Sequence, residues 1–357
     1  MEKINVGILG ATGMVGQRFI SLLDNHPWFN VTTLAASPRS SNKSYSQAVE
    51  ERWSLKSPIP ESVKGINVQI VEDDLKSIAD NVDLVFSALD MDKEKIREIE
   101  NNYAKEGVAV VSNNSAHRWT DDVPMIMPEV NSHHAELIKI QRENRNWTGL
   151  IAVKPNCSIQ SYVPPIDALK TFIPKRILVT TLQAISGAGK TFESWPEMVD
   201  NVIPFIGGEE GKSEKEPMRI WGNIQNGKIE LATQPEVSAT CIRVPASDGH
   251  MASVSVEFEN SPSKEQIIEA WSNFKNPIQE LNLPSAPNPC LKYFDEEDRP
   301  QTKLDRDFQN GMGITMGRLR EDPLFQWKFV CLSHNTVRGA AGGAVLVAEL
   351  LKSKGYF

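Results

Sequence analysis

Cys157 is the residue of this sequence best suited to covalent chemistry. It stands in a Pro-Asn-Cys-Ser run at 155–158, well downstream of a glycine-rich loop at 10–16. A thiolate attacks an activated acyl group, and hydride from a nicotinamide then reduces the thioester to an aldehyde. A buried structural cysteine is the alternative interpretation of any isolated residue of this type. Thioester chemistry is therefore expected only where other parts of a site accompany Cys157.

The glycine-rich loop has the sequence context of a dinucleotide site. It reads Gly-Ala-Thr-Gly-Met-Val-Gly, follows a predicted strand at 4–9 and opens a predicted helix at 14–24. Glycines let the backbone approach a pyrophosphate, and the helix N-terminus supplies free N–H groups. The spacing is G-x-x-G-x-x-G, so a purely structural turn is the alternative. The residues of this loop expected to contact a cofactor are Gly10, Thr12, Gly13, Met14 and Val15.

The end of the second predicted strand, 31–36, indicates which dinucleotide binds. An NAD enzyme usually places an Asp or Glu there to bind the ribose 2′-hydroxyl. This chain has Ala-Ala-Ser-Pro-Arg-Ser at 35–40, without a carboxylate. Arg39 offers a planar, charged donor fork, and Ser37 and Ser40 offer hydroxyl groups. NADP is therefore favoured over NAD, with a solvated arginine in a turn as the alternative.

Alternating strands and helices must position these residues. Predicted strands at 4–9, 31–36, 82–88 and 108–112 alternate with predicted helices at 14–24, 93–105 and 135–144, which indicates a parallel, doubly wound sheet. Beyond about residue 156 the pattern becomes mixed, with strands at 177–184, 251–258 and 327–332 and helices at 193–202, 213–221, 264–274 and 338–352. The predicted fold is α/β: a Rossmann-type domain over 1–155, completed by a C-terminal helix at 336–357, and an α+β domain over 156–335.

Length and charge agree with this plan. A chain of 357 residues is longer than one hydrophobic core usually supports. The net charge of −8 argues against nucleic acid or an anionic membrane as the main partner. The N-terminus does not resemble a signal peptide, so we expect a cytoplasmic location. No pair or cluster of cysteines and histidines has zinc spacing, so no metal is expected.

Further motifs accompany Cys157 in a fixed order. They are Ser-Asn-Asn-Ser-Ala-His-Arg at 112–118, Gln-Ala-Ile-Ser-Gly-Ala-Gly at 183–189, Glu-Glu-Gly-Lys at 209–212, Arg-Val-Pro-Ala-Ser-Asp-Gly-His at 243–250 and Asn-Thr-Val-Arg-Gly-Ala-Ala-Gly-Gly at 335–343. With these motifs the sequence resembles, from end to end, the aspartate-semialdehyde dehydrogenase family in its archaeal and fungal branch. Glyceraldehyde-3-phosphate dehydrogenases share the general plan, but their cysteine precedes a Thr-Thr-Asn run, whereas here Asn156 comes before Cys157.

The resemblance implies a role for each motif. Cys157 would form the acyl-enzyme, Gln183 would orient the acyl group, and His250 would act as general acid/base, for which an imidazole titrating near neutral pH is suited. Arg243 would bind the substrate carboxylate and Glu209 would face its ammonium group. The remaining implied residues are Arg118 and Lys212 for the leaving phosphate, Asn156 for the substrate, and Ser87, Ser186, Gly187 and Asn335 for the cofactor. The region 156–335 would be the catalytic and dimerisation domain.

Two departures from the family pattern lie near the expected active centre. Lys190 follows the Gly-Ala-Gly run where the family commonly has tyrosine, and Ile159 and Gln160 replace a usual Thr-Thr or close variant. Both bear on substrate identity more than on the chemistry. Pro164 and Pro165 restrict any helix after Cys157 to a short or kinked one.

The implied reaction is the NADPH-dependent reduction of L-aspartyl 4-phosphate to L-aspartate 4-semialdehyde, on the way to lysine, threonine and methionine. The closest alternative is a malonyl-CoA or succinyl-CoA reductase, because some archaeal relatives use the same thioester chemistry on an acyl-CoA. The Glu-Glu-Gly-Lys element favours aspartate, since malonate has no ammonium group to recognise. A more remote alternative is a non-catalytic NADP sensor on the same fold. Such a protein would be expected to have lost Cys157 or His250, and both are present here. The resemblance also implies a homodimer or a homotetramer.

Overall fold

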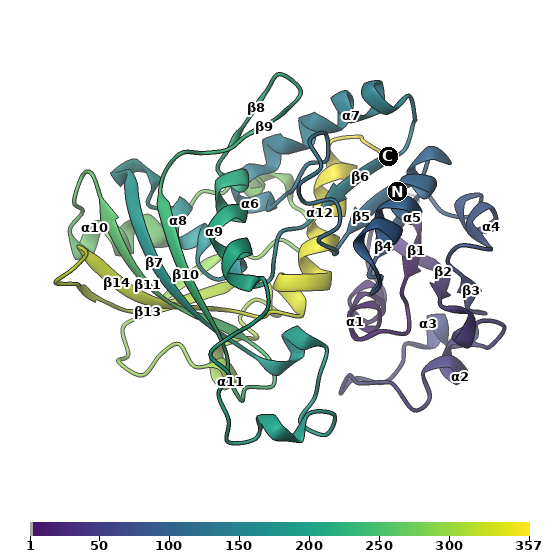
Figure 1. The fold of residues 1–357 in the computed structure, drawn as a ribbon, viewed down its shortest axis with the longest axis horizontal. Coiled ribbons are helices and arrows are strands. Elements are labelled where there is room, and N and C mark those ends of the chain that lie inside the picture. Colours follow the sequence, from purple (N-terminus) through teal and green to yellow (C-terminus); the bar gives the residue numbers. More distant parts are fainter. Residues whose placement is uncertain (1–2) are drawn as a thin grey trace.

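Two six-stranded sheets and one small hairpin make up the strands of residues 3–357, which this computed structural model describes (Figure 1). The first sheet is entirely parallel, in the order β3-β2-β1-β4-β5-β6. Its strands are β1 (Ile4–Leu9), β2 (Phe29–Ala36), β3 (Gln69–Ile70), β4 (Leu84–Ser87), β5 (Ala109–Ser112) and β6 (Leu150–Val153). Every residue of β4, β5 and β6 is buried, as expected of parallel strands covered on both faces. This strand order confirms the predicted Rossmann-type fold.

The helices of the first half follow the patterns in their sequences. Phe19, Ile20 and Leu23 lie buried on one face of α1. The helix α5 begins at Lys93 because the Asp92 side chain accepts hydrogen bonds from the N–H groups of Glu94 and Lys95. The helices are α1 (Met14–Leu23), α2 (Tyr45–Val49), α3 (Glu61–Lys64), α4 (Leu75–Ala79), α5 (Lys93–Lys105), α6 (Pro128–Asn131) and α7 (Leu137–Arg145), with turns η1 (Pro38–Ser40) and η2 (Ser132–Glu136). The helices predicted at 14–24, 93–105 and 135–144 are confirmed as α1, α5 and α7.

The second sheet is mixed, in the order β10-β7-β11-β14-β13-β12. Along β7 and β11, buried residues alternate with more exposed ones, so that one face of the sheet packs on a core. Ile177, Val179 and Val254 of that face share a buried cluster with Trp271 of α10. The strands are β7 (Pro174–Gln183), β10 (Glu236–Arg243), β11 (His250–Phe258), β12 (Leu291–Phe294), β13 (Ile314–Glu321) and β14 (Trp327–Ser333), beside the hairpin of β8 (Asn223–Gln225) and β9 (Lys228–Glu230). The mixed sheet confirms the predicted α+β second half.

The C-terminal helix α12 (Gly342–Ser353) returns to the first half of the chain. Its Val345 and Leu346 belong to the same buried cluster as Ile8 of β1 and Phe19 of α1. Figure 1 shows α12, in yellow, between the two sheets. The other helices of the second half are α8 (Val163–Asp167), α9 (Glu209–Ile220), α10 (Lys264–Ser272) and α11 (Thr302–Asp305), with short turns η3 (Ser158–Gln160), η4 (Lys170–Phe172), η5 (Ile185–Ala188), η6 (Pro196–Met198), η7 (Gln279–Leu281) and η8 (Val337–Ala341).

The helix predicted at 193–202 is wrong, because only the three-residue turn η6 forms there. At the start of this segment, Thr191 and Ser194 exchange side chain to backbone hydrogen bonds that compete with a helix: Thr191 N–H donates to Ser194 Oγ (2.9 Å) and Ser194 N–H to Thr191 Oγ1 (3.3 Å). Pro196 has no N–H to donate, and Asp200 has a φ of 58°. The spacing of apolar side chains in this segment is typical of a helix. Its backbone does not form one, because of these hydrogen bonds, Pro196 and the positive φ of Asp200.

Candidate active site

At two of the three loop glycines, a Cβ atom would collide with nearby backbone, so only glycine fits there. Gly10 has a φ of +84°, and a Cβ atom there would lie 2.5 Å from the carbonyl oxygen of Ala88. A Cβ atom on Gly16 would lie 2.3 Å from the carbonyl oxygen of Gly10. Gly13 is the N-cap of α1, so the first N–H groups of this helix, from Met14 onward, have no partner within it. The loop therefore presents free N–H groups at a helix N-terminus, which suits a pyrophosphate.

A hollow of about 350 Å³ adjoins this loop at the carboxyl ends of the parallel strands. Gly10, Thr12, Gly13 and Ser37 line it, so four predicted cofactor residues meet there. Carboxyl ends of parallel strands are where open α/β sheets bind ligands. The hollow is therefore a fitting place for the adenosine half of a dinucleotide.

The three residues predicted to read a 2′-phosphate differ in availability. Ser37 and Arg39 are exposed, whereas Ser40 is buried. The hydroxyl of Ser40 accepts a hydrogen bond from Arg52 Nη2 (3.1 Å). Arg39 and Ser37 are thus free to meet an anion, while Ser40 is already bonded inside the protein.

Two carboxylates in this hollow, Glu72 and Asp73, were missed by sequence reasoning. They line it just after β3, which pairs with the last two residues of β2. Glu72 is paired with Lys95 (2.6 Å), so its charge is partly balanced. A two-residue strand leaves no periodic signal in the sequence, and only its pairing with β2 brings these residues to the cofactor loop.

A larger cleft of about 550 Å³ is lined from both halves of the chain. Met14 of α1 lines it together with Ser186 and Thr336 of the second half. Asn335 donates from Nδ2 to Ser186 Oγ (2.9 Å) and accepts at Oδ1 from the N–H of Gly249 (2.8 Å). Two of the three residues that the resemblance implies for the nicotinamide half, Ser186 and Asn335 but not Gly187, are therefore joined directly. Ser87 lies buried at the end of β4, outside the residues that line this cleft.

Cys157 lies between β6 and the short turn η3, which confirms that no long helix follows it. The preceding Asn156 shapes this segment, because its Oδ1 accepts from both the N–H (2.8 Å) and the hydroxyl (2.6 Å) of Ser158. A Cβ atom on Gly339 would lie 2.9 Å from Cys157 Cβ, so the backbone of η8 packs directly on the cysteine. Burial, then the nearby Glu209 carboxylate, raises the pKa of the Cys157 thiol, and Lys154 opposes this rise.

Glu209 accepts hydrogen bonds from three of the other predicted residues. Its Oε1 accepts from Asn156 Nδ2 (3.2 Å) and from Lys212 Nζ (2.7 Å). Its Oε2 accepts only a long hydrogen bond from Gln183 Nε2 (3.4 Å), so this oxygen keeps acceptor capacity. Glu209 is buried in the first turn of α9, where the N-terminal end of the helix dipole favours a carboxylate. The arrangement leaves one carboxylate oxygen available to a cation beside Cys157.

Strand pairing brings Gln183, Arg243 and His250 to one edge of the second sheet. Gln183 and Arg243 are register partners at the ends of the parallel strands β7 and β10, and His250 begins the antiparallel neighbour β11. Arg243 Nη1 donates to the carbonyl of Ala184 (2.6 Å), and His250 Nδ1 accepts from the N–H of the same residue (3.1 Å). A Cβ atom on Gly187 would lie 2.9 Å from Arg243 Nη1 and 3.0 Å from His250 Nε2. Both side chains therefore lie directly against Gly187.

The environment of His250 fixes its tautomer. Because Nδ1 accepts from a backbone N–H, the proton of the neutral ring is on Nε2, and Nε2 is buried without a hydrogen-bond partner within the described residues. Burial, then the Arg243 cation, lowers the pKa of His250 to about 3. The sequence expectation of an imidazole titrating near neutral pH thus differs from the structure. The neutral Nε2–H group is a hydrogen-bond donor without an acceptor.

The two cations predicted for a phosphate are engaged within the protein. Arg118 is buried, donates from Nη1 to Glu216 Oε1 (2.9 Å) and from Nε to the carbonyl of Lys154 (3.1 Å). Lys212 is paired with Glu209 (2.7 Å). Glu216, which sequence reasoning missed, also accepts from the N–H of Asn156 (2.6 Å). Its position two helical turns after Glu209 on α9 was the available signal.

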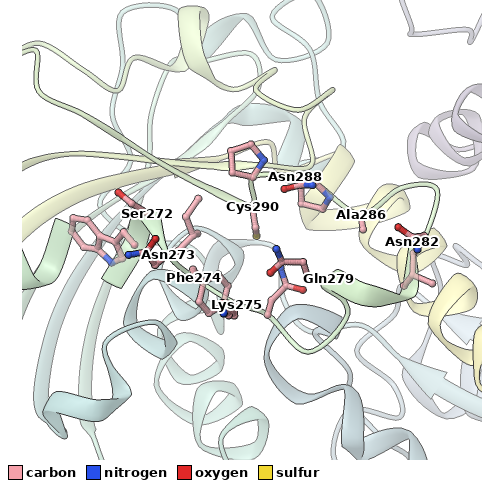
Figure 2. A pocket seen from close by; sticks show the side chains of 15 residues that line it. Ser272, Asn273, Phe274, Lys275, Gln279, Asn282, Ala286, Asn288 and Cys290 are labelled. Carbon is pink, nitrogen blue, oxygen red and sulfur yellow. The ribbon is translucent and has the colours of Figure 1, made fainter. Parts of the chain in front are cut away.

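Another hollow of about 450 Å³ lies elsewhere, between the end of α10 and β12. Figure 2 shows its side chains, among them Asn273, Gln279 and Asn288, with Cys290 close by. It contains none of the residues predicted for the site. Residues 3–357 hold no group of three or more His, Cys, Asp or Glu side chains suited to a metal, and no helix long and apolar enough to cross a membrane.

Family models, sequence relatives and a solved structure all match this chain to one family of enzymes. Residues 5–138 match the family described as semialdehyde dehydrogenase, NAD binding domain, and residues 165–338 match semialdehyde dehydrogenase, dimerisation domain. The chain is 44% identical to an aspartate-semialdehyde dehydrogenase of Archaeoglobus fulgidus, covering 98% of each chain. It is 42% identical to that of Schizosaccharomyces pombe, again over 98% of each. A crystal structure of the Candida albicans aspartate-semialdehyde dehydrogenase with NADP is similar at a TM-score of 0.89, with 36% identity over 100% of both chains.

Proposed function

This chain belongs to the aspartate-semialdehyde dehydrogenase family, and from this premise we propose that it reduces L-aspartyl 4-phosphate with NADPH. The products are L-aspartate 4-semialdehyde, phosphate and NADP, and the acyl group is carried as a thioester on Cys157. Such a reaction serves the biosynthesis of lysine, threonine and methionine. We also propose that the chain assembles with itself, as a homodimer or a homotetramer, through residues 156–335.

One observation carries the choice of substrate: opposite charges meet around Cys157. The Glu209 carboxylate lies near the thiol with an oxygen free to accept, and Arg243 is held at the same sheet edge as Gln183. An aspartyl group carries both an ammonium and a carboxylate, so it matches this pair of charges. A malonyl or succinyl group offers no cation and would face Glu209 with an uncompensated carboxylate.

Cys157 would act on the acyl carbon as the thiolate. The S–C bond forms, the C–O bond to phosphate breaks, and phosphate leaves with the electron pair. Asn156 and Gln183, both held by Glu209, would fix the thioester in place. When bound, NADPH supplies the hydride that reduces this thioester.

His250 would donate a hydrogen bond to the substrate oxygen that gains negative charge during reduction. Its buried Nε2–H is the donor for that oxygen, and its Nδ1 is fixed by the N–H of Ala184. A negative oxygen at Nε2 favours the protonated ring, which opposes the effects of burial and Arg243 and raises the pKa of His250. The proton can then move to and from the oxygen as the aldehyde is released or added.

The cofactor would be held from both halves of the chain. The residues we assign to it are Gly10, Thr12, Gly13, Met14 and Val15 of the loop, Ser37, Arg39 and Ser40 at the 2′-phosphate, Ser186, Gly187 and Asn335 at the nicotinamide end, and Ser87, for which no end of the cofactor is specified. Support comes from the two close glycine contacts in the loop and from the hydrogen bond between Asn335 and Ser186. The Ser40 hydroxyl already accepts a hydrogen bond from Arg52, so we assign Ser40 a contact with the 2′-phosphate that adds to this bond. Arg118 and Lys212 would meet the leaving phosphate only by loosening their pairs with Glu216 and Glu209.

A steady-state comparison of two acyl donors tests the proposal. Wild-type protein should reduce aspartyl phosphate with a kcat/KM more than tenfold above that for malonyl-CoA or succinyl-CoA, equivalent to about 1.4 kcal/mol. Glu209→Gln should narrow this ratio, mainly by lowering kcat/KM for the aspartyl donor.

A matched control is Glu230→Gln, because Glu230 is a partly exposed carboxylate of the β8–β9 hairpin, paired only with Lys228. This variant should keep the wild-type ratio. Equal use of aspartyl phosphate and an acyl-CoA by the wild type would refute the aspartate assignment and favour the acyl-CoA reductase. No reduction of any donor would favour the non-catalytic sensor.

A further inference from the structure

A buried lysine, Lys154, lies three residues before Cys157 and has no role in the proposed mechanism so far. It directly follows β6 and is only 2% exposed. Among the described residues, its Nζ has one hydrogen-bond partner, the carbonyl oxygen of the adjacent Pro155. A buried ammonium group is costly unless an opposite charge meets it. Protonation of Lys154 is therefore favoured only when an anion forms close to it.

The backbone of the C-terminal segment brings Lys154 and Cys157 to neighbouring positions. A Cβ atom on Gly339 would lie 2.9 Å from Cys157 Cβ, and one on Gly343 would lie 3.5 Å from Lys154 Cε. The two side chains thus pack on glycines only four residues apart. Gly339 and Gly343 leave space for both side chains against the same stretch of backbone.

The other charges around Lys154 are already paired. Arg118 is bonded to Glu216 (2.9 Å), and Arg338 is bonded to Glu129 (2.7 Å). Within residues 3–357 Lys154 forms no salt bridge, and its Nζ donates to a carbonyl oxygen instead. The nearby group without a counter-charge that can become an anion is the Cys157 thiol.

We propose that Lys154 is a positioning residue for the nucleophile: it holds the loop through the Pro155 carbonyl, and its ammonium group stabilises the Cys157 thiolate. In forming this ion pair, the neutral thiol of Cys157 loses its S–H proton and the neutral amine of Lys154 gains an N–H bond, so the net charge of the pair is unchanged. This inference rests on the nucleophile assigned in the proposed function.

The ionisation properties of both groups agree with such a pair. Burial, then the cation of Arg118, lowers the pKa of Lys154 to about 7, while the Cys157 thiolate favours the protonated amine. Of the cations that lower the pKa of Cys157, Lys154 has the largest influence, ahead of Arg118 and Arg243. His250 is also near Lys154, but its own low pKa keeps it neutral in the resting protein.

The rate of Cys157 alkylation by iodoacetamide, followed against pH, tests the pair without any acyl donor. Only the thiolate reacts, so the midpoint of the pH profile reports its formation. Lys154→Met removes both the charge and the hydrogen bond, whereas Lys154→Gln removes the charge and keeps a neutral hydrogen-bond donor in the side chain. Both variants should shift the midpoint upward by about one pH unit, which makes alkylation near neutral pH about tenfold slower. Their kcat should fall near neutral pH and recover at alkaline pH.

Lys139→Gln is the control, because Lys139 is an exposed lysine on α7. It should alkylate as the wild type does. NADPH binding measured on every variant identifies folded protein. A midpoint equal to that of wild type in folded Lys154→Gln would overturn the proposal, and so would a loss of kcat that is the same at every pH. Because alkylation involves no acyl donor, this result is separate from the identity of the substrate.

Discussion

Adding one methyl group at Gly187 should impair turnover while leaving the fold almost intact. The Cβ atom of Gly187→Ala would meet Arg243 Nη1 at 2.9 Å and His250 Cε1 and Nε2 at 3.0 Å. Gly187 does not have a positive φ, so alanine is compatible with its backbone. The methyl group therefore acts on two side chains of the site rather than on the main chain.

The size of the effect follows from the displacement that the methyl group requires. Ordinary contact begins at 3.4 Å, so both side chains must retreat by about 0.4–0.5 Å. Misplacing a reacting group by about 1 Å costs about a hundredfold in rate, so half of that displacement costs about tenfold. The movable side chains absorb the contact cheaply, and the free energy of unfolding should fall by less than about 1 kcal/mol.

Two other glycines, Gly189 and Gly207, provide controls with different outcomes. Gly189 has a φ of +67° and open space around it, so Gly189→Ala should lower the free energy of unfolding by about 1–2 kcal/mol without touching His250. Gly207 has open space and no positive φ, so Gly207→Ala should change neither property. Steady-state kinetics with the aspartyl donor and urea unfolding measure both properties, and NADPH titration shows whether Gly187→Ala also weakens the cofactor.

The three variants distinguish an effect on the site from an effect on the fold. A kcat/KM of Gly187→Ala within twofold of wild type would mean that Arg243 and His250 do not need their present positions. A loss of unfolding free energy as large as that of Gly189→Ala would mean that the effect acts through the fold instead.

Three further outcomes are expected. Cys157→Ala should abolish acyl transfer and keep NADP binding near wild type. Mass spectrometry of the wild-type protein, incubated with acyl donor and without NADPH, should find the covalent adduct on Cys157. An adduct on the buried Cys241 or Cys331 would contradict this assignment. Arg39→Ala should weaken NADPH roughly 10–100-fold, because a charge-assisted hydrogen bond contributes about 1.5–3 kcal/mol, and should barely affect NADH; equal losses for both cofactors would exclude a phosphate contact. Burial lowers the pKa of His134 from 6.5 to about 4, so its contribution to stability is present above about pH 6.5 and is lost as the pH falls toward 4. His134→Gln should therefore flatten the acid dependence of urea unfolding, and an unchanged slope would contradict this.

Local pattern predicted most of the first half. Residues 4–9 form β1 as expected, since six residues of that pattern suit a buried strand, and α5 begins and ends at the predicted residues 93 and 105. The glycine loop was identifiable because its constraint is local: Gly10 and Gly16 are needed by backbone within the same strand–turn–helix unit and its neighbour. The segment 193–202 failed because the side chains of Thr191 and Ser194 bond to the backbone there.

The site residues themselves came from sequence motifs, and their assigned contacts remain proposals. The domain limits, 1–155 with 336–357 and 156–335, likewise stay predictions. Glu216 and Lys154 carried no motif, because their importance comes from what they touch. Glu216 binds Arg118 and the N–H of Asn156, which lie 98 and 60 positions away in the chain.

Sequence alone determined the residue types that could do the chemistry, the glycine loop and the order of strands and helices. These depend on short-range spacing and on the intrinsic properties of thiol, imidazole and guanidinium groups. Tertiary structure alone decided how those groups meet and how they ionise. The parallel pairing of β7 and β10 sets Arg243 beside Gln183, and the burial of His250 changes its pKa from near neutral to about 3. Both effects arise from groups distant in the chain and from the exclusion of water, neither of which is encoded in the spacing of neighbouring residues.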